Sequence, residues 1–237
     1  MIPHVIHYCW FGRGEKPKLA LKCIESWRKF FPDYEIKEWN EDNFDVNIIP
    51  YTAQAYERRK YAFVSDYARF WILYHHGGLY FDTDVEVIRP MDDIVAQGPF
   101  MGIEVNSTRD DETPAVAPGL GLGAEPGMSI YKAVLDHYAT QHFVDSNGKQ
   151  NEGTVVSHNT QVLAANGLRA TNEPQQVAGV WIYPQDYFNP YRYTVDRLEI
   201  TERTRSIHWY GASWISPWGR LRLRLGTFVR KHILHHS

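Results

Sequence analysis

Residues 5 to 39 read VIHYCWFGRGEKPKLALKCIESWRKFFPDYEIKEW, and this stretch decides the fold. Its first part, residues 5–11, is an apolar run typical of a buried strand, and Gly12 closes it. A helix can begin at Pro17, and its predicted apolar face holds Leu21, Ile24, Trp27 and Phe31. Residues 34–39 form a second strand-like run. A strand, a helix and a strand at this spacing predict an α/β fold with a mainly parallel sheet flanked by helices.

The next part of the chain repeats the alternation of helix and strand. Residues 56–76 show helical periodicity, as one helix or two, until Gly77 and Gly78 stop it. Residues 79–81 then form an apolar strand that runs into Asp82-Thr83-Asp84. Later segments are predicted as strands at 100–105, 119–123 and 180–183, as helices at 128–141 and 159–166, and as a loop at 106–118. Because α/β folds bind ligands at the carboxyl ends of their strands, the acidic triplet stands where a site is expected.

The acidic triplet favours a metal site. In an extended segment the side chains of Asp82, Asp84 and Glu86 share one face, because strand side chains alternate. Carboxylates crowded at a buried strand end are costly unless a cation neutralises them, and Mg²⁺ or Mn²⁺ suits oxygen ligands. Such a cation can hold two phosphates. The alternative is a solvated turn, since 28 acids in 237 residues produce about three such triplets by chance.

Composition excludes some partners. The formal charge is -3, with 25 basic and 28 acidic residues, so no overall positive field favours nucleic acid. The chain has 8 Trp and 15 Tyr, whose rings can form flat walls for bases and sugars. With 2 Cys and no apolar run of about 18 residues, we expect a reduced compartment and a cytoplasmic protein.

The C-terminal segment differs in charge from the rest. Residues 218–237 contain five basic side chains and no acid: Arg220, Arg222, Arg224, Arg230 and Lys231. We therefore divide the chain into a catalytic domain, 1–216, and a basic amphipathic helix, 217–237. Such a helix can lie on an anionic membrane at its inner face, or it can dock on the catalytic domain.

Three ordered motifs carry a resemblance. Ile-His-Tyr-Cys-Trp-Phe-Gly at 6–12, Ser-Asp-Tyr-Ala-Arg at 65–69 and Gly-Gly-Leu-Tyr-Phe-Asp-Thr-Asp at 77–84 resemble glycosyltransferase family 32. That family includes bacterial capsular polysaccharide transferases and yeast mannosyltransferases, and is related to clostridial glucosylating toxins. The resemblance implies a GT-A fold, a nucleotide-sugar donor, a divalent metal and retention of anomeric configuration. It also implies a glycan or lipid-linked glycan acceptor and a UDP-sugar donor, with a GDP-sugar as the alternative.

The resemblance also implies site residues. Trp10 would stack on the donor base, although it could instead cap the core. Asp66 and Arg69 would contact the donor sugar and its phosphate side; the alternative is an ion pair within the helix. Ser65 and Tyr80 match neighbouring positions of the donor pocket. Asp82 and Asp84 would be the metal ligands.

The later part of the chain carries a looser match. His208-Trp-Tyr-Gly-Ala-Ser213-Trp214 resembles a C-terminal motif that returns to the metal and the diphosphate, with His208 as ligand and Ser213 or Trp214 as phosphate donors. Relatives among the toxins place an acid near this position, and a core histidine is the alternative. Asn159 would lie near the donor sugar. Glu104 and Asp110 or Asp111 fall near the expected acceptor side, but no nucleophile motif distinguishes any of them, and the alternative is that they are solvated loop acids.

Three functions remain open. The sequence favours a metal-dependent retaining hexosyltransferase of polysaccharide synthesis, acting by front-face attack or through a protein carboxylate. The first alternative is another metal-dependent phosphate enzyme, because paired carboxylates serve that chemistry too. The second is a sugar-binding module without catalysis, which leaves the acidic triplet unexplained.

Overall fold

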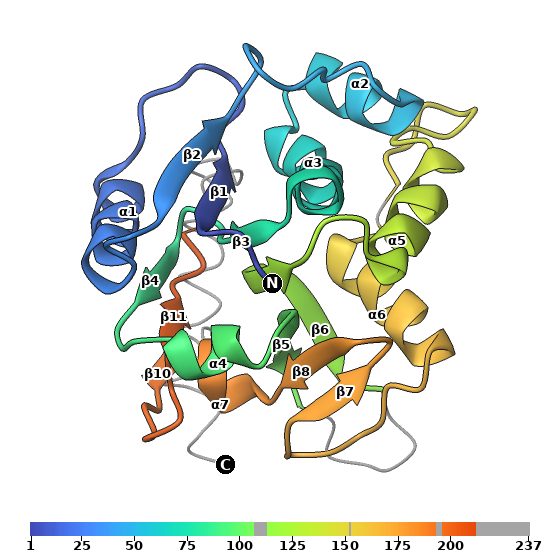
Figure 1. Cartoon of the computed structure of the whole chain (residues 1–237). Coiled ribbons are helices and arrows are strands. Elements are labelled where there is room, and N and C mark those ends of the chain that lie inside the picture. Colours follow the sequence, from blue (N-terminus) through green and yellow to red (C-terminus); the bar gives the residue numbers. More distant parts are fainter. Residues whose placement is uncertain (107–112, 152, 193–195, 212–237) are drawn as a thin grey trace, which may run out of the picture.

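The computed structural model describes residues 1–106, 113–151, 153–192 and 196–211. Within them a seven-stranded sheet has the order β2-β1-β3-β6-β5-β8-β7 (Figure 1). Its strands are β1 (Val5–Cys9), β2 (Glu35–Trp39), β3 (Gly78–Tyr80), β5 (Phe100–Val105), β6 (Ala115–Ala124), β7 (Gln175–Val177) and β8 (Val180–Tyr183).

Strand direction confirms the prediction of a mainly parallel sheet. β1 pairs in parallel with β2 and β3, and β5 pairs in parallel with β8. β6 is antiparallel to both β3 and β5, so those two strands run the same way, and β7 is antiparallel to β8. The carboxyl ends of β1, β2, β3, β5 and β8 therefore lie at one edge.

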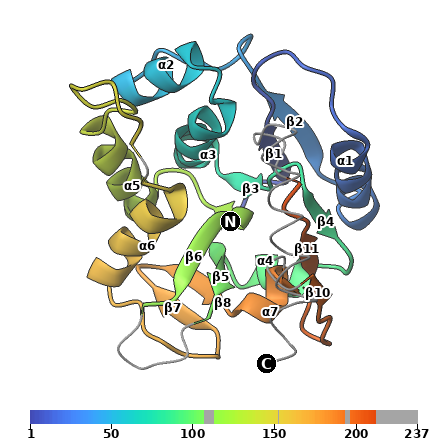
Figure 2. The same ribbon diagram turned by 180° about the vertical axis from the view of Figure 1, so that it is seen from behind.

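Helices cover both faces of the sheet (Figures 1 and 2). They are α1 (Lys18–Phe30), α2 (Pro50–Glu57), α3 (Tyr61–His76), α4 (Asp92–Ala96), α5 (Ser129–Ala139), α6 (Val155–Ala165) and α7 (Gln185–Phe188). Residues that alternate along a strand pack into two hydrophobic cores, one on each face of the sheet. Met101 and Ile103 of β5 pack with α3, α5 and α6, whereas Phe100 packs with α1 and α7. This alternation is what buries the sheet on both sides.

Two short ladders complete the described fold. β11 (Ser206–His208) is antiparallel to β4 (Val85–Val87), and β9 (Tyr191–Arg192) pairs with β10 (Arg197–Leu198). Figures 1 and 2 both show β11 beside β4. The chain therefore returns near residue 208 to the segment that follows the acidic triplet.

Two local predictions need correction, and one open alternative is decided. Leu21 is 54% exposed, because the buried face of α1 runs through Ala20, Cys23, Ile24 and Trp27, one position away. For residues 56–76, where one helix or two was expected, the structure confirms two, separated at Arg59, whose positive φ of 57° breaks the helix. β6 begins at Ala115, inside the predicted loop.

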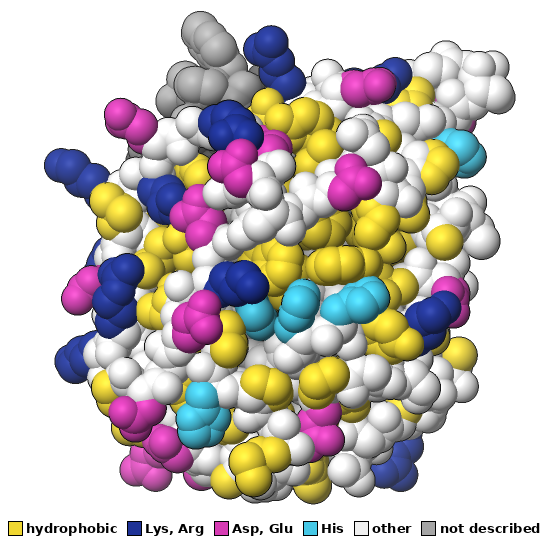
Figure 3. Space-filling model, turned by 45° about the horizontal axis from the view of Figure 1, so that its top comes forward, with side chains coloured by type: hydrophobic (Ala, Val, Ile, Leu, Met, Phe, Trp, Pro, Cys, Tyr) yellow, Lys and Arg dark blue, Asp and Glu magenta, His cyan; other side chains and the backbone are white. Residues whose placement is uncertain are grey.

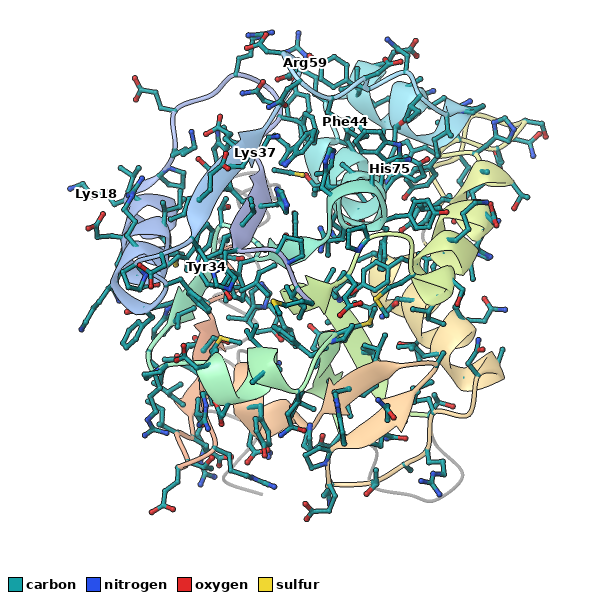
Figure 4. The ribbon with its side chains drawn as sticks, viewed as in Figure 1. Lys18, Tyr34, Lys37, Phe44, Arg59 and His75 are labelled. Carbon is teal, nitrogen blue, oxygen red and sulfur yellow. The ribbon has the colours of Figure 1, made fainter. Side chains whose placement is uncertain are left out.

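The face drawn in Figure 3 carries histidines among apolar side chains. His75 and His76 form the last turn of α3 and are exposed; cationic groups suit this end of a helix dipole. Figure 4 labels His75 there, together with Lys37 on β2 and Arg59 between α2 and α3. Within the described residues, no helix is both long and apolar enough to span a membrane.

Candidate active site

The acidic pair occupies a tight turn at the carboxyl end of β3. The strand ends at Tyr80, and the N–H of Val85 donates to the carbonyl of Asp82 at 3.0 Å, just where β4 begins. The prediction of one extended face carrying residues 82, 84 and 86 is therefore wrong, because side chains alternate only while the backbone stays extended.

Glu86 makes contacts of its own. Its carboxylate accepts hydrogen bonds from Lys22 Nζ at 2.7 Å and from Trp209 Nε1 at 2.8 Å. It does not belong to the cluster of possible metal ligands among the described residues. The turn directs Asp82 and Asp84 together and leaves Glu86 out.

β11 adds a histidine to this pair. The antiparallel ladder sets His208 opposite Val85, and His208 Nε2 lies 3.1 Å from Asp84 Oδ1. One ligand atom from each of Asp82, Asp84 and His208 falls within 4.8 Å of the others. The structure thus brings together the three residues that the sequence analysis named as metal ligands.

Backbone N–H groups of the segment that follows β11 also hold Asp84. The N–H of Trp209 donates to the Asp84 carbonyl at 2.9 Å, and the N–H of Gly211 donates to Asp84 Oδ2 at 2.8 Å. With the His208 contact, both carboxylate oxygens of Asp84 have partners. The position of this side chain is therefore set by residues more than a hundred positions along the chain.

Arg69 connects helix α3 to the acidic turn. Its guanidinium lies 2.9 Å from Asp66 Oδ1 and 3.3 Å from Asp82 Oδ2, and its Nε donates to the Ser65 carbonyl. Arg69 is only 4% exposed. The ion pair within the helix is thus present, and the same arginine also reaches the acidic turn.

Gly119 of β6 permits the close approach of Asp82. The Asp82 N–H donates to the Gly119 carbonyl at 3.2 Å, and a Cβ on Gly119 would lie 2.1 Å from Asp82 Oδ2. Sequence reasoning missed this residue. The signal was present in Gly119-Leu-Gly-Leu-Gly123, since glycines inside a strand often mark a close approach.

The three possible ligands have shifted pKa values. Burial raises the pKa of Asp82 despite the opposing Arg69 guanidinium. Burial would also raise the pKa of Asp84, but His208 and the Gly211 N–H outweigh it and lower that pKa. Burial alone would lower the pKa of His208, but the Asp84 carboxylate raises it, and the net shift of this pKa is upward. Of these two carboxylates, Asp82 is therefore the one whose charge is less compensated.

A cavity of about 410 Å³ opens over this cluster. Its wall contains predicted site residues from four parts of the chain: Trp10, Ser65, Arg69, Asp82, Asp84 and His208. This volume lies in the range of small-molecule sites. Trp10 lies partly exposed on this wall, with its Nε1 donating to the Gly14 carbonyl at 2.6 Å.

Other predicted site residues lie behind the wall or elsewhere. Asp66 sits behind Arg69, where burial raises its pKa to about 7 against the opposing arginine. Tyr80 is buried and donates to Asp82 Oδ1 at 3.1 Å. Asn159 is fully buried in α6 and donates to the Val116 carbonyl at 3.2 Å. Contacts of Asp66, Tyr80 and Asn159 with a donor stay predictions, and Ser213 and Trp214 lie outside the described residues.

The cavity also has a basic and aromatic side that sequence reasoning missed. Arg59, Lys60 and Tyr61 line it from the start of α3. A Cβ on Gly12, whose φ is +92°, would meet the Tyr61 ring at 2.2 Å. No local motif marks this contact, because it joins two segments about fifty residues apart.

Comparisons with known proteins agree with this geometry. A family model described as the glycosyltransferase sugar-binding region containing the DXD motif matches residues 17–101. An uncharacterized glycosyltransferase, L373, of Acanthamoeba polyphaga mimivirus is 24% identical over 196 residues, covering 80% of this chain and 76% of the relative.

A yeast relative matches a shorter region. Inositol phosphoceramide mannosyltransferase 3 of Schizosaccharomyces pombe is 31% identical over 98 residues. These cover 40% of this chain and 27% of the relative, so the match spans about a quarter of that protein.

A solved structure shows the fold. The PaToxG glycosyltransferase superposes with a TM-score of 0.50 at 20% identity, covering 69% of each chain. The chain therefore has the GT-A fold, as the resemblance implied. The family model and the curated relatives agree on one class of enzyme, a glycosyltransferase.

Proposed function

We propose that this protein is a metal-dependent, retaining glycosyltransferase that moves a hexose from a nucleotide-sugar donor to a glycan or lipid-linked glycan. The observation that supports this most is the convergence of Asp82, Asp84 and His208 in the wall of a cavity that Trp10 also lines. A nucleotide-sugar donor has a base, a diphosphate and a sugar, and each of these parts needs its own group of contacts in the cavity wall.

The residues present fit a divalent cation. Two carboxylates and an imidazole offer ligand atoms within 4.8 Å of one another, and the Nδ1 atom of His208 is buried without a hydrogen-bond partner in the described part of the chain. Oxygen ligands with one imidazole suit Mn²⁺ and Mg²⁺. When bound, the cation would supply positive charge that stabilises the leaving diphosphate.

The protein's own side chains account for donor binding. Trp10 offers an indole face to the base. Arg69 would orient the phosphate side of the donor sugar, because Asp66 and Asp82 hold its guanidinium in place. A UDP-sugar is the donor we favour, with a GDP-sugar as the alternative; two yeast relatives are mannosyltransferases, so mannose belongs among the sugars tested.

Transfer with retention can occur on the face that the diphosphate leaves. The acceptor hydroxyl forms a bond to the anomeric carbon as the bond between that carbon and the phosphate oxygen breaks. The departing phosphate oxygen takes the hydroxyl proton. This route needs no separate base. Double displacement through a protein carboxylate is the second route to retention.

The setting of the reaction is also a proposal. Capsular or cell-surface polysaccharide synthesis follows from the resemblance of the motifs, and a cytoplasmic location follows from composition. Contact with an anionic membrane would involve residues 217–237, which lie outside the described residues.

A screen of nucleotide sugars tests the proposed function. The purified protein is incubated with UDP- and GDP-hexoses and Mn²⁺, and release of the nucleoside diphosphate by slow hydrolysis is measured. We expect one donor to be turned over, and chelation by EDTA to stop the reaction. Tight binding of glycans with no turnover of any donor would support the sugar-binding module instead.

Trp10→Ala should weaken binding of both the free nucleoside diphosphate and the intact donor by about 1–3 kcal/mol, the scale of stacking a base on an aromatic ring. Calorimetry with Mn²⁺ present measures both affinities. Trp181→Ala is the control, because this partly exposed tryptophan lies on β8 away from the cavity wall. Unchanged affinity in Trp10→Ala would assign the indole to packing alone.

Asp66→Asn should weaken binding of the sugar part of the donor. At pH 8, above the Asp66 pKa of about 7, the substitution keeps side-chain volume but removes the charge. Affinity for the intact donor should then fall by about 1.5–3 kcal/mol, the range for a hydrogen bond to a charged group. Affinity for the free nucleoside diphosphate should stay unchanged. Equal losses for both ligands would show that Asp66 acts only by holding Arg69.

A further inference from the structure

A second polar cluster adjoins His208 outside the cavity wall. The hydroxyl of Tyr210 donates to Glu104 Oε1 at 3.0 Å and accepts from Asn189 Nδ2 at 2.7 Å. Asn189 Nδ2 also donates to the Glu104 carbonyl at 3.0 Å. Both the side chain and the backbone of Glu104 are thus held in place.

This cluster is coupled to the possible metal ligands through one short segment. The ring of Tyr210 lies 4.2 Å from the His208 ring, centroid to centroid, and the next residue, Gly211, donates to Asp84. Tyr210 has a positive φ of 49°, an unfavourable conformation for an aromatic residue. Strain of this kind persists where surrounding contacts fix a position, and here those contacts set Glu104 relative to Asp84.

Strand direction gives the order of groups along the sheet edge. Trp10 follows β1, Asp82 follows β3, and Glu104 lies near the carboxyl end of β5, and these ends share one edge. The strand order places β3 between β1 and β5. A donor with its base at Trp10 and its diphosphate at Asp82 therefore leaves the Glu104 side for a second substrate.

The Glu104 position is open to such a substrate. Glu104 is half-buried, so part of it stays accessible in the described part of the chain. The Glu104 carboxylate has a second oxygen beyond the one that Tyr210 occupies, and an ionised carboxylate is purely an acceptor of hydrogen bonds. Hydroxyl groups are the donors that suit it.

Building on the proposed function, we propose that Glu104 binds the acceptor, a polyhydroxylated molecule such as a sugar or a cyclitol, and that Tyr210 positions Glu104. Glu104 accepts a hydrogen bond from an acceptor hydroxyl and so orients the acceptor toward the donor sugar. Transfer itself follows the route described above, in which the hydroxyl proton passes to the departing phosphate oxygen. Asn189 fixes the Tyr210 hydroxyl from the other side.

The experiment measures the effect of a substitution on hydrolysis of the donor separately from its effect on transfer to the acceptor. With the nucleotide sugar that the wild type hydrolyses, release of nucleoside diphosphate is measured in Mn²⁺ alone and with added methyl hexopyranosides or myo-inositol. The variants are Glu104→Gln, Glu104→Asp and Tyr210→Phe. Glu199→Gln is the control, a glutamate paired with Arg197 outside the cluster.

In Glu104→Gln we expect hydrolysis without acceptor to stay within about twofold of wild type, while the acceptor-dependent rate falls about tenfold or more with a raised acceptor KM. Tyr210→Phe should raise the acceptor KM with a smaller effect on kcat, and Glu104→Asp should recover part of the loss. Equal losses of hydrolysis and transfer, or none, would overturn the assignment. Wild-type hydrolysis that no polyhydroxyl compound stimulates would overturn it too, whereas a wild type that hydrolyses no donor refutes the proposed function instead.

Discussion

Replacing Asp84 with asparagine should lower turnover by about a thousandfold while the chain stays folded. The substitution keeps the side-chain size, and the amide oxygen can still accept from the Gly211 N–H at the Oδ2 position. It removes a negative charge from the proposed ligand set, and metal stabilisation of a leaving group is worth several kcal/mol, or about three orders of magnitude in rate.

Turnover at saturating Mn²⁺ and the melting temperature measure this effect together. Asp136→Asn is the matched control, since this aspartate forms an exposed pair with Lys132 on α5. It should keep full activity. A folded Asp84→Asn protein with wild-type turnover would contradict a metal role for Asp84.

Replacing Arg69 with methionine should cost about 3–5 kcal/mol of folding stability, because it leaves the buried Asp66 and the partly exposed Asp82 without their cationic partner. Arg69 is 4% exposed and contacts both Asp66 and Asp82. Denaturant unfolding of the apo protein measures the loss, and donor turnover should disappear with it.

The chain contains a matched control for this prediction. Arg28 and Glu25 on α1 have the same spacing as Arg69 and Asp66, but their side chains are 58% and 74% exposed. Arg28→Met should therefore change stability by less than about 1 kcal/mol. Similar losses in both variants would mean that burial does not decide the strength of the Arg69 pairs.

Local patterns in the sequence predicted the elements but not their junctions. The strand–helix–strand unit of residues 5–39 and the strand before Asp82 were predicted correctly, because apolar runs and glycine stops are local signals. Leu21 was assigned to the wrong face, since one residue in a helix is a rotation of about 100° and short apolar runs leave the buried face ambiguous.

The site depends on contacts that no local pattern contains. His208 reaches Asp84 only because β11 pairs with β4, and the sequence analysis named it through a family resemblance. Gly119 matters because β6 lies beside β3, and the turn at Asp82 excludes Glu86 from the cluster. Strand pairing between distant segments fixes these relations, and a sequence read by periodicity does not show it.

Calorimetric titration of the nucleoside diphosphate in the presence and absence of Mn²⁺ tests the central claim most directly. If Asp82 and Asp84 hold the diphosphate through a cation, Mn²⁺ should strengthen diphosphate binding, and the diphosphate should strengthen Mn²⁺ binding by the same factor. Both effects should vanish in Asp84→Asn. A nucleoside diphosphate that binds the wild type equally well with Mn²⁺ and with EDTA would contradict the account.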